Sequence, residues 1–446
     1  MENGIIEAFY PITFRKDDAA SLGAHLKDRH SVVLIGMKRV GISNFLRFFL
    51  NHKDIAKTYI GDGSSHLFIP VDLNDLVERE VGPFWILTLK RILDVVNKYP
   101  FGKEVKKKIE TLFLDSIQSQ DLFLTIDSVR RSLIGLLENG LLPTIFFLRF
   151  DRMKDTATPE LFANLQGLKD ATHHKLSYVF TSYRSLDALS PSVFTRATLS
   201  VFSKDLYIKP AKQVDTKTIF KTYKDRYKLN LSPLIERTLL EMVDGYIQYL
   251  QLALIYLHER KNPLKTKDEF FESLSKDEEI GLQSEELWES LGQQEKNVIT
   301  KIIKNEKVTE EEKDGGKYLW DTGLVVDSRV FSPLFDYYVK QTEKKSSNNN
   351  IVELTKKENL LFNFLKDSIN LVCEREQIVE GVWPEVEALG VSDWAIDRLV
   401  ARVRNKLKLQ KSQYEIQTVR TRGYKLVEAG SPYEVPLSGT KAGINR

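Results

Sequence analysis

The segment Ser392–Leu407, SDWAIDRLVARVRNKL, predicts a helix with two different faces. Its apolar residues recur three or four positions apart, which is the spacing of one side of an α-helix. They are Ile396, Leu399, Val400, Val403 and Leu407. Asp397, Arg398, Ala401, Arg402 and Asn405 fall on the other faces, and Ser392 is a typical N-cap residue. We therefore expect a helix that packs on one side and offers guanidinium groups on the other.

A basic hairpin is predicted directly after this helix. Two short strands, Glu415–Val419 and Lys425–Val427, flank the tip RTRGY. From Arg398 to Lys425 the chain has nine Lys and Arg against one acid, whereas residues 354–397 have four bases against nine acids. A single basic helix is usually just a solvated surface. The adjacent net charges of +8 and −5 show that the charge is concentrated and not spread along the chain.

The order of the elements around the helix indicates its role. The sequence TKKE, Thr355–Glu358, is a capping box that opens a first helix. A second helix is expected over Arg375–Trp383, followed by the basic helix and the hairpin. Three helices and a basic wing are the elements of a winged helix-turn-helix, whose third helix enters the major groove of DNA.

Four segments in this region resemble, in order and spacing, the OmpR/PhoB-type DNA-binding domain. They are ELTKKENLLFNFL, CEREQIVEGVW, VSDWAIDRLVARVRNKL and IQTVRTRGYKLV, and together they span about 75 residues. The resemblance implies double-stranded DNA as a partner and a set of contact positions on the third helix and the wing. Those positions are Trp394, Arg398, Arg402, Arg404, Thr418, Arg420 and Arg422. Trp394, Leu399 and Ala401 depart from the usual family residues, so the target sequence does not follow from the resemblance.

The composition is that of a globular protein with several domains. At 446 residues the chain is long enough for about three domains, with 42% hydrophobic and 28% charged residues. The net charge of +3 excludes a polycation, so a nucleic-acid role must rest on the local basic patch. The single cysteine, Cys373, excludes an internal disulfide framework and favours a reducing, cytoplasmic location. Neither a secretory signal over residues 1–11 nor a membrane span is predicted, and no metal-ligand spacing is present.

A phosphate-binding architecture is predicted near the N-terminus. Ser31–Gly36, SVVLIG, is a buried strand candidate, and the loop MKRVGISN leads into an apolar helix. The pattern G-x-x-x-x-G-K-[ST] is satisfied by Gly36, Gly41 and Ser43, but Ile42 stands at the lysine position. Isoleucine offers neither a charge nor a donor to a phosphate, so the loop amides and Ser43 would hold one only weakly.

Strands and helices then alternate, which is typical of a mostly parallel, doubly wound sheet. The predicted strands are His66–Leu73, Thr144–Phe150 and Leu176–Thr181, and the predicted helices are Pro83–Val96 and Ile126–Leu137. A helical stretch, Lys212–Arg260, follows the last strand and its neighbouring segment.

This half of the chain resembles the AAA+/STAND ATPases with Orc-like lids. The resemblance rests on Arg15 before a helix and on the segments VVLIGMKRVGISNFL, FFLRFDRM and YVFTSYRSL. It implies nucleotide-binding positions at Gly36, Gly41, Ser43, Asn44, Asp151 and Thr181. Two registers of the metal-binding strand remain open, one with Leu148 and Arg149 at the Asp-Glu pair and one with Asp151 and Arg152. In both registers an arginine replaces the glutamate that activates water.

The joint loss of the lysine and the glutamate predicts a pseudo-ATPase without catalytic residues, because phosphoryl transfer relies on positioned charge around the γ-phosphate. Binding of ATP or ADP stays open, and a Mg²⁺ ligand is doubtful. Two alternatives also stay open, namely an active ATP-dependent switch on DNA and a scaffold that pairs with an active ATPase.

The predicted fold class is α/β followed by α+β, with a helical lid and two winged-helix modules. The predicted parts are a P-loop domain (1–210), the lid (211–278), a winged-helix module (279–341), a linker (342–353), the OmpR/PhoB-type module (354–428) and a disordered tail (429–446). We expect a cytoplasmic, DNA-binding transcriptional regulator whose N-terminal platform senses a signal or assembles copies. Assembly as a homo-oligomer or with a partner ATPase is left open, and no membrane contact is expected.

Overall fold

The computed structural model describes most of the chain and divides it into two compact units. The described residues are 5–61, 65–99, 102–195, 199, 202–260, 266–345, 354–384, 391, 393–419 and 422–428. The first unit comprises Met1–Phe271 and Ser290–Asp336, and the second comprises Glu272–Glu289 and Tyr337–Arg446. The second unit therefore takes a segment from the middle of the chain in addition to the C-terminal part.

A five-stranded parallel sheet forms the centre of the first unit, which confirms the predicted architecture. Its strand order is β2-β3-β4-β1-β5. The strands are β1 (Ser31–Ile35), β2 (His66–Asp72), β3 (Leu142–Leu148), β4 (Ser177–Ser182) and β5 (Ser203–Tyr207). Strand β1, which lies between β4 and β5, is buried along its whole length.

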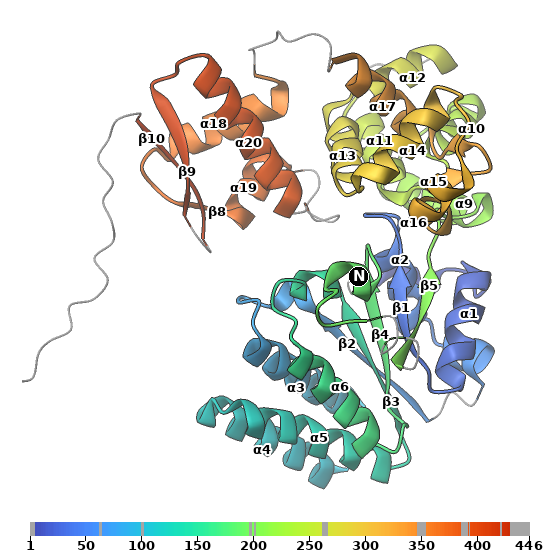
Figure 1. Cartoon of the computed structure of the whole chain (residues 1–446), viewed down its shortest axis with the longest axis vertical. Helices are drawn as coiled ribbons and strands as arrows, with labels where there is room; N and C mark the ends of the chain where they lie inside the picture. Colours follow the sequence, from blue (N-terminus) through green and yellow to red (C-terminus); the bar gives the residue numbers. More distant parts are fainter. Residues whose placement is uncertain are drawn as a thin grey trace, which may run out of the picture. The chain divides into compact units, whose positions relative to one another are not determined.

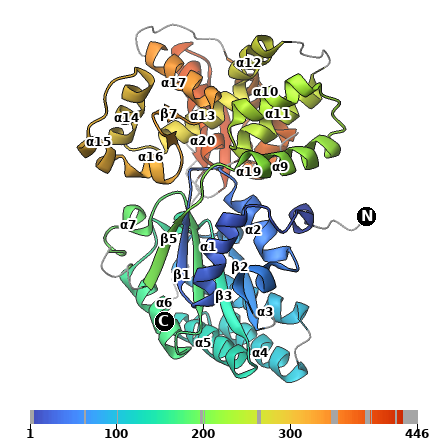
Figure 2. The same cartoon turned by 90° about the vertical axis from the view of Figure 1, so that its right-hand side faces the viewer.

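Helices cover both faces of this sheet (Figures 1 and 2). Successive strand residues point to opposite faces. Phe147 belongs to a large aromatic and aliphatic core shared with α3, α5 and α6, whereas Phe146 packs against Phe49 of α2 on the other side. The helices of this layer are α1 (Lys16–Lys27), α2 (Ile42–Asn51), α3 (Val81–Lys98), α4 (Lys103–Ser119), α5 (Leu122–Glu138) and α6 (Pro159–Ala171).

The rest of the first unit is mainly helical and ends in a small hairpin. Its helices are α7 (Leu186–Leu189), α9 (Gln213–Arg226), α10 (Pro233–Val243), α11 (Ile247–Glu259), α14 (Gln293–Ile303), α15 (Glu310–Gly315) and α16 (Lys317–Asp321). Helix α12 (Lys267–Ser275) crosses the boundary between the two units, which lies after Phe271. The hairpin strands are β6 (Val325–Val326) and β7 (Arg329–Val330). Helix α17 (Pro333–Lys345) then runs past Thr342, so the first residues of the predicted linker are helical. The linker residues 346–353 lie outside the described residues.

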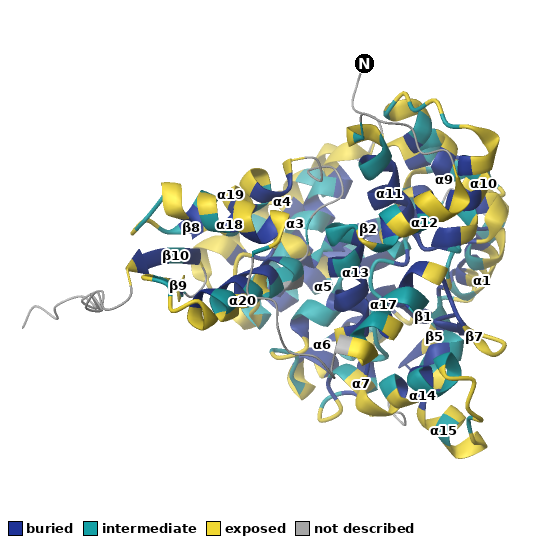
Figure 3. Cartoon of the chain, turned by 90° about the horizontal axis from the view of Figure 1, so that it is seen from above, coloured by how far each residue is buried: buried dark blue, intermediate teal, exposed yellow. Residues whose placement is uncertain are grey.

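The second unit contains a winged-helix domain together with α13 (Glu278–Glu289). The domain consists of α18 (Lys356–Asp367), β8 (Cys373–Glu374), α19 (Arg375–Val382), α20 (Asp393–Leu409), β9 (Tyr414–Val419) and β10 (Gly423–Glu428). The strands form an antiparallel sheet in the order β8-β10-β9, and four of the six residues of β10 are buried (Figure 3). The predicted capping box at Thr355 is present. The predicted tail, 429–446, lies outside the described residues.

Candidate nucleic-acid interface and phosphate site

Helix α20 is fixed in the winged-helix domain by its apolar stripe. The five residues that the periodicity selects, Ile396, Leu399, Val400, Val403 and Leu407, are all buried. They face α18 and α19, which pack against α20. Because one side of the helix is used in this way, its arginines must lie on the remaining sides.

Two of these arginines, Arg398 and Arg402, form ion pairs with the same carboxylate. Arg398 donates from Nε to Oε1 of Glu285 at 2.7 Å, and its Nη2 lies 2.6 Å from the same oxygen. The Nη2 atom of Arg402 contacts Oε2 of Glu285. Burial lowers the pKa of Arg402, but a guanidinium still stays protonated near neutral pH. Two of the three arginines of α20 that are predicted to contact DNA are thus joined to an acid of α13.

Within the described residues, Arg404 forms its hydrogen bonds with the wing and not with α13, and it holds α20 against β9. Its Nε donates to the carbonyl oxygen of Ile416 at 2.8 Å, and its Nη2 donates to Oγ1 of Thr418 at 2.7 Å. Both partners belong to β9, so Arg404 and Thr418, each expected at the DNA interface, are brought together by the fold.

A polar cluster around Arg375 joins α19, α20 and the wing, and the sequence reasoning missed it. The Nη2 atom of Arg375 lies 2.6 Å from Oδ1 of Asp397 and donates to the hydroxyl of Tyr424 at 3.2 Å. The Tyr424 hydroxyl in turn donates to Asp397. Desolvation, with the Asp397 carboxylate, raises the pKa of Tyr424 to about 12, so the hydroxyl remains a donor at neutral pH.

The tip of the wing presents Arg422 to solvent. Its side chain is 65% exposed, and the nearest acid, Glu374, is 3.9 Å away. The next residue, Gly423, lies so close to β8 that an added Cβ would fall 2.1 Å from the carbonyl oxygen of Cys373. Arg420 and the side chain of Trp394, two further predicted contacts, lie outside the described residues.

The glycine-bounded loop joins β1 to α2, as the sequence predicts. Gly41 adopts φ +110° at the start of α2, a backbone conformation that favours glycine. Ile247, the first residue of α11, packs directly over it, since an added Cβ on Gly41 would lie 2.7 Å from Ile247 Cγ1. The Tyr246 hydroxyl donates to the carbonyl oxygen of Lys38 at 2.6 Å. The start of α11 therefore covers the loop.

The residues of this loop that are predicted to bind phosphate differ in burial and in hydrogen bonding. Gly36 approaches the backbone of Ile208, whose oxygen would be 2.8 Å from an added Cβ. Ser43 is exposed, whereas Asn44 is buried and donates to Oε1 of Glu7 at 3.1 Å. Ser43 is thus accessible for a phosphate, while the Asn44 amide is engaged elsewhere.

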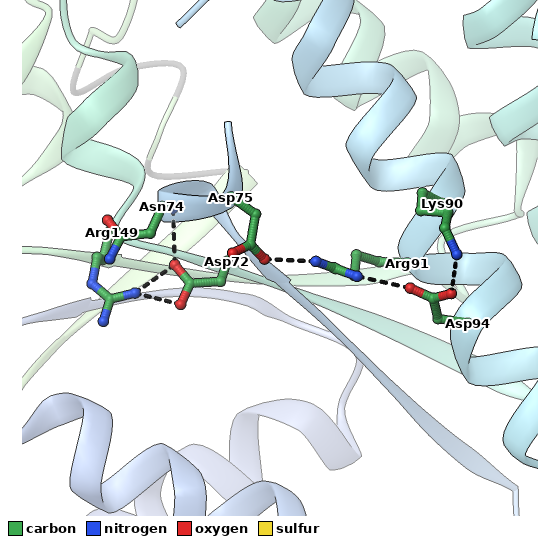
Figure 4. A network of polar contacts seen from close by, with 7 residues as sticks. All are labelled: Asp72, Asn74, Asp75, Lys90, Arg91, Asp94 and Arg149. Atoms are coloured by element: carbon green, nitrogen blue, oxygen red, sulfur yellow. Dashed lines mark hydrogen bonds and ion pairs between the residues drawn. The ribbon is translucent and has the colours of Figure 1, made fainter. Parts of the chain in front are cut away.

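At the end of β3, Arg149 pairs with Asp72 at the end of the neighbouring strand β2 (Figure 4). The backbone N–H of Asn74 also donates to Asp72, at 3.0 Å. The same edge carries a second ion-paired group, made of Asp75, Lys90, Arg91 and Asp94 (Figure 4). In one of the two registers Arg149 replaces the catalytic glutamate. In that register a guanidinium that is ion-paired with Asp72 lies where the glutamate would be.

Asp151 lies in the 3₁₀ turn η4 (Phe150–Met153) near the loop. Burial raises the pKa of its carboxyl group, while the charges of Lys38, Arg149 and Arg152 lower it. The Lys38 ammonium lies 5.0 Å from the centre of the Tyr183 ring. The hydroxyl of Thr181, at the end of β4, accepts from the backbone N–H of Arg149 at 2.7 Å. Lys38 of the loop and Asp151 therefore interact electrostatically, which the sequence did not predict.

Arg15, noted in the sequence only as a residue before a helix, lies beside the loop. Its side chain is buried, and Nη1 donates to Asp18 and to the carbonyl oxygen of Lys209. Its Nη2 would be 3.8 Å from a Cβ on Gly41. Within the described part of the chain, Nε and Nη2 form no hydrogen bond. No group of three metal-ligating side chains occurs among the described residues.

Comparison with known proteins assigns the C-terminal module. Residues 348–426 match the family described as "Transcriptional regulatory protein, C terminal". No curated protein matches the chain. Among the residues with a described position, no helix is long and apolar enough to span a bilayer.

Among solved structures, similar chains include three archaeal proteins. The Walker-type ATPase PABY2304 of Pyrococcus abyssi has 15% identity and a TM-score of 0.45, covering 73% of this chain and 95% of its own. The ORC2 protein of Aeropyrum pernix has 13% identity and a TM-score of 0.44, covering 78% and 98%. The ORC1 protein of the same organism, solved in complex with DNA, has 11% identity and a TM-score of 0.34, covering 96% and 91%.

Proposed function

Because the C-terminal module is an OmpR/PhoB-type winged-helix domain, we propose that the protein is a DNA-binding transcriptional regulator. The proposal rests mainly on the third helix of this domain, α20. One side of α20 is apolar and buried, and arginines and lysines lie on its other sides. Arg398 and Arg402 lie on the side of α20 that is free of the domain's own core. Arg422 at the wing tip is placed to meet a phosphate, since wing residues flank the groove that the third helix enters.

The N-terminal P-loop ATPase fold serves, in this proposal, as a platform that does not hydrolyse ATP. Ile42 supplies no cation for a β- or γ-phosphate, and in either register of the metal-binding strand an arginine, Arg149 or Arg152, replaces the water-orienting glutamate. Ser43, the loop amides and Arg15 can still attract an anion, because helix N-termini and guanidinium groups bind phosphate. A bound nucleotide would then influence the protein by stabilising one conformation of this domain, and its hydrolysis would not be needed.

The test is a fluorescence-anisotropy titration of mixed-sequence duplex DNA with the full chain at several salt concentrations. We expect the logarithm of affinity to fall linearly with the logarithm of salt concentration, as counterions are released from the phosphates. Arg422→Ala should reduce the magnitude of that slope by about 0.9 if the guanidinium neutralises one phosphate. Parallel titrations with ATP and Mg²⁺ show whether the platform alters DNA affinity.

A matched control is Arg237→Ala, which removes an exposed, ion-paired arginine of α10 in the other unit. The control should leave the slope unchanged. An equal loss of slope in both variants would mean that the wing has no special contact with phosphate. Absence of salt-dependent binding by every variant would refute the proposal.

A further inference from the structure

We propose that α13 masks the DNA-reading side of α20, so that the second unit holds the regulator in a closed state. This inference rests on the proposed DNA-binding function. Its starting point is that one carboxylate, Glu285, is shared by Arg398 and Arg402. These are the two arginines of α20 that the domain's own core and wing leave for a partner.

The masking helix, α13, is strongly acidic, and two of its glutamates lie on the same face. Its sequence, EEIGLQSEELWE, contains five glutamates and no base. Glu278 and Glu285 are seven positions apart, which places both on one face about 10 Å apart along the helix. Asp277 caps the helix, since its Oδ1 accepts from the N–H groups of Glu279 and Ile280 at 3.1 and 3.0 Å.

Contacts at both ends of that face hold α13 to the winged-helix domain. Glu278 accepts from the backbone N–H of Lys357 at 2.9 Å and from the hydroxyl of Thr355, at the start of α18. Oε1 of Glu279 lies 2.7 Å from Nζ of Lys357. Glu285 is buried at the other end, against α20. The acids therefore contact a helix N-terminus and two guanidinium groups, both of which favour anions.

This closed arrangement and DNA binding exclude each other for two physical reasons. A guanidinium that is bonded to a carboxylate cannot offer the same donors to a base edge or phosphate. The major groove is about 12 Å wide and admits one α-helix, so α20 cannot enter it with α13 lying on its exposed side. Opening must therefore precede binding, and the apparent affinity is the intrinsic affinity reduced by the open fraction.

The variant that tests the mask is Glu285→Gln in the full chain, because glutamine keeps the size of the side chain and removes its charge. We expect its affinity for duplex DNA to rise roughly tenfold over the wild type at low salt. Salt also weakens the α13–α20 ion pairs. The wild type should therefore show the shallower salt dependence, and the two affinities should converge at high salt. Glu278→Gln should give a smaller rise.

The control is Glu272→Gln, which removes an equal charge from an exposed pair with Lys276 one helix earlier. A rise for Glu285→Gln alone supports the mask. Equal rises in both variants reflect net charge only and overturn it. Identical affinities and slopes for all three proteins also overturn it, while leaving the proposed DNA-binding function intact.

A second measurement tests, without DNA, whether α13 protects Arg398 and Arg402. An arginine-specific dicarbonyl reagent, followed by peptide mass spectrometry, should modify Arg398 and Arg402 slowly in the wild type and faster in Glu285→Gln. Arg237 serves as the exposed internal reference. Equal modification rates in both proteins would overturn the mask. If no protein binds DNA while the protection persists, the DNA-binding function fails and the helix contact stands.

Discussion

Three arginines lie within two turns of α20, and they have two different environments. Arg398 and Arg402 meet an acid from a distant part of the chain, whereas Arg404 bonds to the wing. Sequence spacing placed Arg398 and Arg402 away from the apolar stripe, whose residues are buried, whereas Arg404 was selected by the family resemblance. The sequence did not separate their roles, because Arg398 and Glu285 are 113 positions apart and no local pattern joins them.

At this scale we predict that Arg404→Ala loosens the wing. The substitution removes two hydrogen bonds to β9 and should cost about 1–3 kcal/mol of local stability. The measurement is amide hydrogen exchange of β9 and β10 by mass spectrometry, which should be faster in the variant. Arg404→Lys should restore little, because an ammonium cannot reproduce the forked geometry.

Arg422→Ala is the matched comparison, because the exposed Arg422 side chain lies 3.9 Å from Glu374 and, within the described residues, forms no hydrogen bond to β9. It should leave the exchange rates of β9 and β10 unchanged. Unaltered exchange in Arg404→Ala would show that the arginine has no part in holding the wing.

Among the elements, the small sheet of the winged-helix domain depends on one glycine. We predict that Gly423→Ala disrupts the pairing of β10 with β8, because the new Cβ would meet the Cys373 carbonyl at 2.1 Å. The loss should be about 1–3 kcal/mol, as for other backbone clashes in packed positions. Thermal unfolding, with hydrogen exchange to localise the change, measures it.

The same substitution at Gly135 is the control. Gly135 lies within α5 and an added Cβ there meets nothing within 4 Å. Gly135→Ala should therefore stabilise the protein by about 0.5–1 kcal/mol, since alanine is the better helix former. Destabilisation at Gly135 and tolerance at Gly423 would contradict this account of the two sites.

Elements with a strong apolar period were predictable, and those without one were not. The strands β1 to β4 follow apolar runs, and the sequence places them to within two residues. The edge strand β5 was missed because its Lys204 and Asp205 are exposed and break the pattern. Helix α4 was missed because its lysine-rich sequence buries few side chains, and β8 is only two residues long.

For the whole molecule, the expected activity on ATP follows from several sites together. We predict no phosphate release by the wild type, with or without DNA, and none by Ile42→Lys. The variant restores a cation to the loop, but an arginine, Arg149 or Arg152 according to the register, still replaces the water-orienting glutamate. A coupled phosphate assay with ATP and Mg²⁺ checks this, and release above the buffer blank by the wild type would contradict it.

The arrangement of the chain into units was harder to predict than the fold of each part. Sequence patterns separated a P-loop domain, a lid and two winged-helix modules at their changes of composition. They did not show that residues 272–289 join the C-terminal part, because α13 reads as an ordinary amphipathic helix with a solvated acidic face. The role of Glu285 becomes visible only from its ion pairs with Arg398 and Arg402 in the structure.

Helices α13 and α20 belong to one polypeptide, and this has a quantitative consequence for the cell. A tethered competitor acts at an effective concentration set by the chain that connects it, about millimolar for short flexible connections. The ratio of closed to open molecules is therefore the same at low and at high copy number. Making more of the protein would raise occupancy of DNA in proportion, but only a change in the α13–α20 equilibrium would alter how responsive each molecule is.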